Sequence, residues 1–138
     1  MGLILDTTVL IAAERKRFDL AGLFAAHKDE PVLMAAITAS ELLHGVERAS
    51  TDKRQERSRF VEGLLASIEA VEFDLPIARR HAAMWAHLES SGTMIGAHDL
   101  QIAVTALHHG HGLATLNVRE FKRIRGLSLA DTAPYRMS

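Results

Sequence analysis

The chain has 138 residues, of which 48% are apolar and 24% charged, a composition typical of one globular domain rather than of a disordered or membrane-spanning chain. Its formal net charge is −1 at pH 7, so nucleic-acid binding would require a local basic patch. The absence of cysteine excludes disulfides, Cys-ligated zinc and thiol catalysis, and it is compatible with the reducing cytoplasm.

The N-terminal half predicts buried strands followed by helices. The first apolar run is interrupted by Asp6 and closed by the charged residues 14–17, so neither a signal peptide nor a spanning helix fits it, and we expect a cytoplasmic protein. In chain order, the pattern predicts a strand at 2–5, a helix at 7–15, a helix at 19–27, a strand at 32–37, a helix opening at Thr38 and a helix at 51–67.

The C-terminal half continues the alternation. It predicts a strand at 71–73, a helix from Pro76 to about Ser90, a helix at 97–109, a strand at 113–116, a helical turn at 117–122 and an edge strand at 127–129. The apolar positions of the helix that bears Met84 and Trp85 are expected in the core. Strands that alternate with helices predict an α/β domain over residues 1–138, in which helices cover both faces of a parallel sheet.

Three acidic residues mark the points where strand or turn segments lead into helices. Asp6 follows the first strand, and Glu41 and Asp99 fall in the first turns of later helices. Ligands of parallel sheets bind outside the carboxyl ends of the strands, so these carboxylates are expected to converge there. Since like charges at close range repel, a divalent cation is the expected counter-charge. Magnesium and manganese prefer such hard oxygen ligands.

Each acid also has a structural interpretation. Asp6 could cap the helix that follows it, and Asp99 could be a favourable charge in a first helical turn. The segment from Thr38 to Glu41 matches a capping box, in which the Glu side chain binds the cap residue's amide. If all three acids served helices in this way, the chain would be a non-enzymatic interaction subunit.

Other polar clusters are less specific. The histidines at 108, 109 and 111 lack the spacing of a zinc site and lie where a helix ends. Arg119, Lys122 and Arg123 follow Asn117 and are candidate RNA-binding residues, although a solvated surface accounts for them equally well. No P-loop, dinucleotide fingerprint or nucleophile elbow is present.

Four segments in the same order resemble the PIN-domain ribonucleases of the VapC toxin type. They are LILDTTVLI, ITASELLHG, IGAHDLQIAVTAL and LATLNVREFKRIRGL, which together extend over nearly the whole chain. The resemblance implies a three-layer α/β/α PIN-like domain with a central parallel sheet, Mg²⁺- or Mn²⁺-dependent endoribonuclease activity, and inhibition by a small cognate antitoxin. It also implies a homodimer.

The resemblance assigns roles to individual residues. Asp6, Glu41 and Asp99 match the family's catalytic and metal-binding acids, Thr8 matches a polar residue that supports the first acid, and Thr115 matches a hydroxyl residue that orients a carboxylate. Many relatives carry a fourth acid where this chain has Asn117, which offers an oxygen but no charge, so either one or two ions fit. Neither the RNA that is cut nor the antitoxin is encoded in these motifs, and a PIN nuclease of RNA processing is the alternative.

Overall fold

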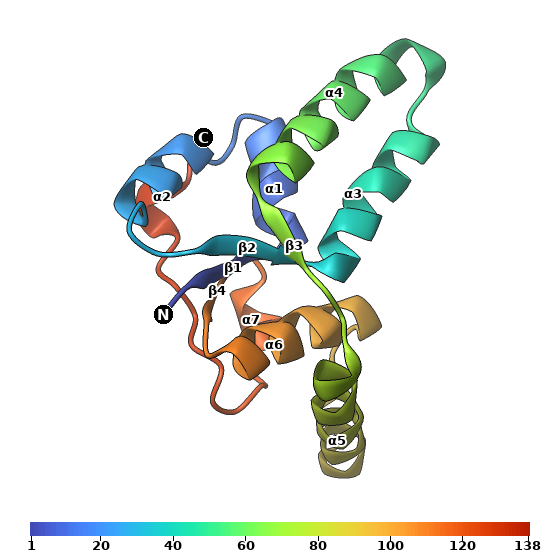
Figure 1. Cartoon of the computed structure of the whole chain (residues 1–138), viewed down its shortest axis with the longest axis vertical. Helices are drawn as coiled ribbons and strands as arrows, with labels where there is room; N and C mark the ends of the chain where they lie inside the picture. Colours follow the sequence, from blue (N-terminus) through green and yellow to red (C-terminus); the bar gives the residue numbers. More distant parts are fainter.

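The computed structural model describes residues 1–138 as one parallel sheet with helices on both faces, which confirms the predicted α/β/α architecture (Figure 1). The elements, in chain order, are β1 (Leu3–Leu5), α1 (Thr7–Glu14), α2 (Leu20–Ala26), β2 (Val32–Ala35), α3 (Ala36–Arg48), α4 (Thr51–Ser67), β3 (Glu69–Val71), α5 (Leu75–Ser91), α6 (Ala97–His109), β4 (Gly112–Ala114), α7 (Val118–Phe121) and a short 3₁₀ helix, η1 (Ala133–Tyr135). No helix combines the length and the apolar character that crossing a bilayer requires.

The strand order brings the carboxyl ends of β1, β2 and β4 together. The order in the sheet is β3-β2-β1-β4, and all three pairings are parallel. The chain therefore moves outward from β1 through β2 and β3, and then returns to place β4 on the other side of β1. Ligand sites in open parallel sheets form where the strand order reverses in this way. The segments that leave β1, β2 and β4 thus surround one position at the edge of the sheet.

Two buried cores lie on opposite faces of the sheet because successive side chains of a strand point in opposite directions. In β1, Leu3 and Leu5 pack into the core beneath α1, α2 and α4, whereas Ile4 packs against α5 and α6 (Figure 1). Each of these side chains is at most 2% exposed. Full burial of an aliphatic side chain contributes roughly 1.5–3 kcal/mol, so the short β1 is fixed in place from both sides.

Most element positions agree with the sequence prediction, but four strands differ. The strand predicted at 113–116 lies at Gly112–Ala114. The strand predicted at 32–37 ends at Ala35, because α3 begins at Ala36 rather than at Thr38. The strand predicted at 71–73 lies at Glu69–Val71. The edge strand predicted at 127–129 is reduced to one isolated bridge between Leu113 and Leu129.

The expectation for α5 is half right. Met84 packs against the core formed with α6, but Trp85 is 48% exposed and its ring lies edge-on to His81. Leu75, at the start of the same helix, is 63% exposed. The helix projects from one end of the molecule in Figure 1, so only one of its faces meets the core.

Candidate functional site

Asp6 lies at the carboxyl end of β1, where its backbone N–H donates to the Ala114 carbonyl over 2.9 Å. Its side chain is 1% exposed, and its Oδ2 accepts hydrogen bonds of 2.6 Å from the hydroxyls of both Thr8 and Thr115. Burial raises the pKa of Asp6 above its usual value, although the two hydroxyl hydrogen bonds oppose the shift. The two threonines thus fix the orientation of a buried carboxylate.

The same threonines connect Asp6 to the loop after β4. The Thr8 hydroxyl accepts a hydrogen bond from the Leu116 N–H at 3.1 Å, and the Thr115 hydroxyl accepts one from the Asn117 N–H at 2.9 Å. Asp6 occupies the N-cap position of α1, yet its carboxylate makes no capping hydrogen bond to that helix. The interpretation of Asp6 as a helix cap is therefore wrong.

Glu41 is not used in a capping box either. Because α3 begins at Ala36, Thr38 lies inside the helix, and the N-cap residue Ala35 makes no side-chain cap. Instead, Glu41 Oε1 accepts a hydrogen bond of 2.8 Å from the Thr7 hydroxyl. The Thr7 hydroxyl also lies 3.1 Å from that of the fully buried Thr38. The end of β1 and the first turns of α3 are therefore joined through this carboxylate.

His98 lies beside Glu41 on the other side, with 3.3 Å between its Nδ1 and Glu41 Oε2. The sequence did not indicate whether His98 faces the site. It precedes Asp99 in α6, so this contact brings the N-terminus of α6 next to α3.

The pKa of Asp99 is shifted strongly upward. Burial raises its pKa to about 6, and the charges of Asp6, Glu120 and Glu41 add to the shift, while His98 opposes it. Three carboxylates from other parts of the chain thus act on one half-buried acid. The three acids singled out from the sequence do meet in one negatively charged region, which local helix capping does not explain.

The fourth carboxylate of the region is Glu120, which the site prediction did not include. Its Oε1 accepts a 2.9 Å hydrogen bond from the N–H of Gly96, the N-cap residue of α6. A Cβ on Gly96 would lie 3.4 Å from Asp99 Oδ2 and 4.0 Å from Glu120 Oε1, so both acids approach this glycine. Asn117 caps α7 by position, but its amide makes no hydrogen bond to the acids.

The donor set suits a hard divalent cation. As they are placed, no three His, Asp or Glu side chains are close enough to hold one ion together. Magnesium, however, usually keeps several waters and takes only one or two protein carboxylates directly. Asp6 Oδ2 carries both hydroxyl hydrogen bonds, which leaves the other carboxylate oxygen without a side-chain partner. A cation would also relieve the repulsion that Asp99 experiences from the neighbouring carboxylates.

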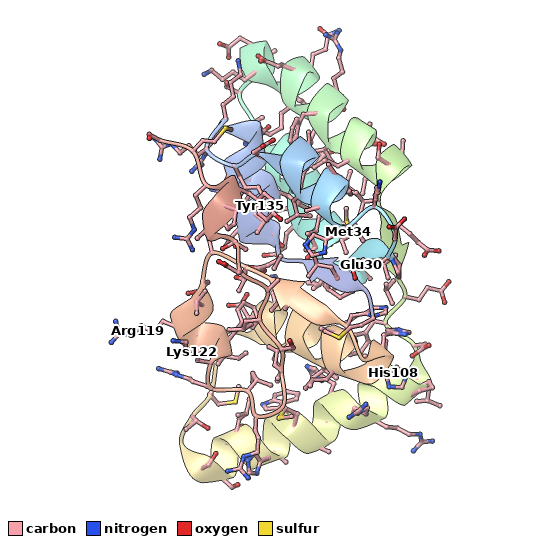
Figure 2. All side chains as sticks on the ribbon, turned by 90° about the vertical axis from the view of Figure 1, so that its left-hand side faces the viewer. Glu30, Met34, His108, Arg119, Lys122 and Tyr135 are labelled. Atoms are coloured by element: carbon pink, nitrogen blue, oxygen red, sulfur yellow. The ribbon has the colours of Figure 1, made fainter.

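The three predicted RNA-binding residues differ in whether their side chains contact the rest of the protein. Arg123 donates from Nη1 to the Met94 carbonyl over 2.8 Å and thus secures the loop that precedes α6. Arg119 and Lys122 are exposed and extend from α7 into solvent (Figure 2).

The histidines near the end of α6 form a separate cluster. His111 Nδ1 accepts a hydrogen bond of 2.9 Å from the Gly2 N–H, and the His109 and His111 rings stack with centroids 5.9 Å apart. Gly2 precedes β1, so the cluster lies at the amino ends of the strands, opposite the acids.

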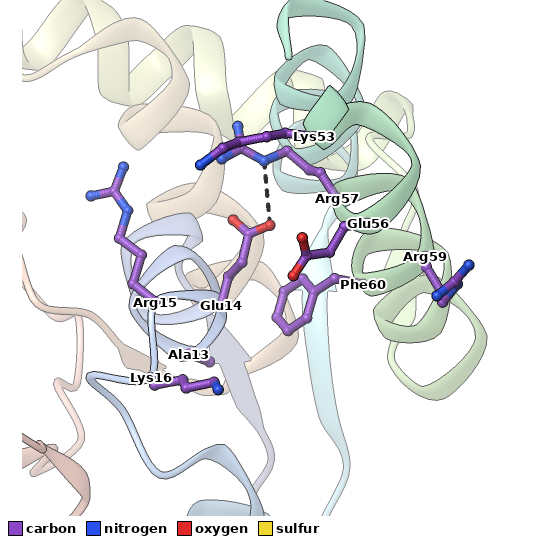
Figure 3. A pocket seen from close by; sticks show the side chains of 9 residues that line it. All are labelled: Ala13, Glu14, Arg15, Lys16, Lys53, Glu56, Arg57, Arg59 and Phe60. Carbon is purple, nitrogen blue, oxygen red and sulfur yellow. Dashed lines mark ion pairs between the residues drawn. The ribbon is translucent and has the colours of Figure 1, made fainter. Parts of the chain in front are cut away.

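A hollow of about 550 Å³ opens between the end of α1 and α4 (Figure 3). Its lining includes Glu14 of α1, Lys16 of the turn that follows it, and Lys53 and Arg57 of α4. None of Asp6, Glu41 and Asp99 lines it. The buried and mutually repelling carboxylates therefore mark the better candidate for a catalytic site, in spite of the size of this hollow.

Comparisons with known proteins agree with this assignment of the fold. Residues 3–127 match the family model described as PIN domain. The chain is 35% identical over 130 residues to ribonuclease VapC1 of Rickettsia felis, with 94% of this chain and 95% of the relative covered. It is 31% identical to the tRNA(fMet)-specific endonuclease VapC of Salmonella typhimurium, over 85% of this chain and 82% of the relative. The solved structure of DNA-bound VapBC from Salmonella typhimurium superimposes with a TM-score of 0.87 at 28% identity, and covers 96% of this chain and 99% of that one.

Proposed function

The chain belongs to the PIN-domain family, and from this premise we propose that it is an endoribonuclease toxin that depends on Mg²⁺ or Mn²⁺ and is inhibited by a cognate antitoxin. The observation that carries the proposal is the convergence of Asp6, Glu41 and Asp99: burial raises the pKa of Asp99 to about 6, and the charges of Asp6 and Glu41 add to that shift. An uncompensated carboxylate cluster costs stability, so its presence is best explained by a cation that binds there.

The proposed reaction is hydrolysis of an RNA phosphodiester bond by water. Asp6, Glu41 and Asp99 would surround the ion, one or two of them directly and the rest through its bound waters, with Asn117 as an uncharged oxygen donor. The chemistry that such an ion supplies when bound is a lowered pKa for its water and neutralisation of charge on the leaving oxygen. The chain's own contribution is orientation. Thr8 and Thr115 fix Asp6, and Thr7 fixes Glu41.

The partners follow from the same premise. Relatives named as a ribonuclease and as an endonuclease specific for tRNA(fMet) support RNA as the substrate class. The similarity to a VapBC structure supports an antitoxin partner. Arg119 and Lys122 are exposed beside the loop that follows β4, where they could contact RNA phosphates.

We further propose that residues 1–138 act as a single PIN-like domain in the cytoplasm, and that two copies form a homodimer. The exposed apolar side chains of α5, Leu75 and Trp85, are the surface that supports dimerisation. Light scattering coupled to size exclusion would give the mass of one chain if this proposal is wrong.

The experiment for the central proposal is cleavage of a labelled RNA by purified protein, in Mg²⁺, in Mn²⁺ and in EDTA. Asp6→Asn and Asp99→Asn should each remove cleavage while circular dichroism shows an intact fold. Asp29→Asn is the matched control, because Asp29 is exposed and away from the acids. Cleavage that survives in EDTA, or in both site variants, would reject the proposal in favour of a non-enzymatic subunit or another chemistry.

A further inference from the structure

We propose that a groove beside Glu41 binds the phosphate backbone of the RNA next to the bond that is cut, through Arg48 and Arg57. This inference rests on the proposed ribonuclease function. The groove has a volume of about 400 Å³, and its lining includes Thr7, Glu41, His44, Gly45, Arg48 and Arg57. Its lining therefore combines a carboxylate of the candidate catalytic site with two arginines.

The groove follows one face of α3. Glu41, Gly45 and Arg48 are spaced four and three residues apart, which places them on one side of the helix. At 1.5 Å per residue, Arg48 lies about 10 Å beyond Glu41 along the helix axis. A phosphate bound at Arg48 would thus be a neighbour of the cleaved phosphate, rather than the cleaved phosphate itself. Arg48 is exposed and forms no ion pair, so its charge is available.

Arg57 enters the groove from α4. Its Nη1 lies 4.0 Å from the position that a Cβ on Gly45 would occupy, and its Nε lies 3.3 Å from Glu14 Oε2 on α1 (Figure 3). The contact with Glu14 uses one side of the guanidinium, which carries five N–H donors in all. The ion pair therefore orients Arg57 and leaves donors free for a phosphate.

Gly45 helps to keep the groove open. Glycine inside a helix costs about 1 kcal/mol relative to alanine. Space does not require it here, because a Cβ would meet only Arg57 Nη1, at an ordinary contact distance of 4.0 Å. A longer side chain would extend into the groove between Glu41 and Arg48. The α4 helix contains a second interior glycine, Gly63, with nothing within 4 Å of its would-be Cβ, and this residue offers a matched control.

Charge favours RNA over an acidic protein segment as the occupant. The carboxylates around Asp99 repel any anion unless a cation is present, so attraction toward the site must come from its rim. Arg48 and Arg57 supply that attraction without a metal. Because the groove opens directly onto Glu41, a backbone bound along it would continue into the candidate catalytic site. Binding of an acidic peptide would not require the groove to lead into the candidate catalytic site.

The test separates binding from cleavage. In an Asp99→Asn background and in EDTA, binding of a fluorescent single-stranded RNA is measured by anisotropy over a range of salt. R48Q and R57Q should each weaken binding about fivefold and lower the slope of log K against log salt by about 0.7, the value for one lost phosphate contact. G45L should weaken binding by blocking the groove. R79Q and G63L, on exposed positions elsewhere, should bind as the background protein does.

A second readout uses otherwise wild-type protein. R48Q should raise KM about fivefold and leave kcat within about twofold, since the contact forms in ground and transition states alike. Thermal melting of each variant checks its fold.

The outcomes distinguish this inference from the proposed function. If R48Q and R57Q bind RNA with the same affinity as R79Q, the proposed role of the groove is overturned, even if the protein cleaves RNA. Competition by polyglutamate as effective as that by RNA also overturns it, in favour of a protein partner. Arginine-dependent RNA binding in a protein that does not cleave RNA supports the groove and rejects the nuclease.

Discussion

The cost of burying the Asp99 carboxylate beside other carboxylates predicts that Asp99→Asn stabilises the metal-free protein. The pKa of Asp99 is raised from 3.8 to about 6. At about 1.4 kcal/mol for each pKa unit, this shift corresponds to about 3 kcal/mol of unfavourable free energy in the folded state above pH 6. Asp99 is only half-buried, so solvent screening reduces the expected gain to about 1 kcal/mol. For a domain of this size, that gain raises Tm by about 3–4 °C.

The pH dependence gives the sign of the effect. Above pH 6 the carboxyl is ionised in both the folded and the unfolded state, and only the folded state bears the cost of its desolvation and of the repulsion. As the pH falls from 6 toward 3.8, the folded state alone takes up a proton, so the wild-type protein gains stability. The advantage of Asp99→Asn should therefore be largest at pH 7.5 and should shrink at pH 4.5.

The assay is thermal melting in EDTA at these two pH values, with Asp29→Asn as the control because Asp29 is an exposed acid. Added Mg²⁺ should stabilise the wild type and remove the advantage of the variant, because the ion relieves the same repulsion. A variant that is no more stable than the wild type in EDTA at pH 7.5 would refute the reasoning.

Three further predictions concern the residues around the acids and one helix end. Thr115→Val removes a hydroxyl that donates to Asp6 and accepts from the Asn117 N–H, so urea unfolding should show a loss of about 1–2 kcal/mol; an unchanged midpoint would contradict the contacts. Glu120→Gln keeps an oxygen for the Gly96 N–H but removes a charge, so carbon NMR titration should show a lower pKa for Asp99, and an unaltered titration would place Glu120 outside the cluster. Asp74→Ala removes the N-cap of α5, whose carboxylate accepts from the Ile77 N–H over 3.1 Å, and should cost about 1 kcal/mol; no loss of stability would show that this cap contributes little.

The amino-acid pattern predicted elements well where their boundaries carry local signals. The helix at 51–67 was placed correctly because its charged sequence has clear ends, and Gly92 and Gly110 end α5 and α6 with the positive φ that glycine tolerates. The start of α3 was misplaced because Ala36 and Ile37 extend an apolar run. Such a run looks the same in a buried strand and in a buried helical turn.

The sequence pattern does not predict the exposure of Trp85 on α5, for a similar reason. Met84 and Trp85 are adjacent in an amphipathic helix, and hydrophobicity alone does not reveal which of them faces the core. That depends on how α5 packs against α6, which is a property of the tertiary structure.

At the candidate site, the sequence located the acids and the structure supplied their partners. Asp6, Glu41 and Asp99 could be singled out because each marks a junction between elements. The contact of His98 with Glu41, and that of Glu120 with Gly96, join segments far apart in the chain. No local pattern encodes them. A glutamate in the first turn of α7, near the end of β4, was the only sequence signal for Glu120.

Calorimetric titration of Mn²⁺ into the metal-free protein tests most directly whether the acids share one cation. A shared cation should bind saturably near pH 6 with release of protons, because the ion displaces the proton from Asp99, so the measured heat should vary with the ionisation enthalpy of the buffer. Asp99→Asn should weaken the binding and abolish the dependence on buffer. Absence of binding, or binding that Asp6→Asn and Asp99→Asn leave unchanged, would contradict the account.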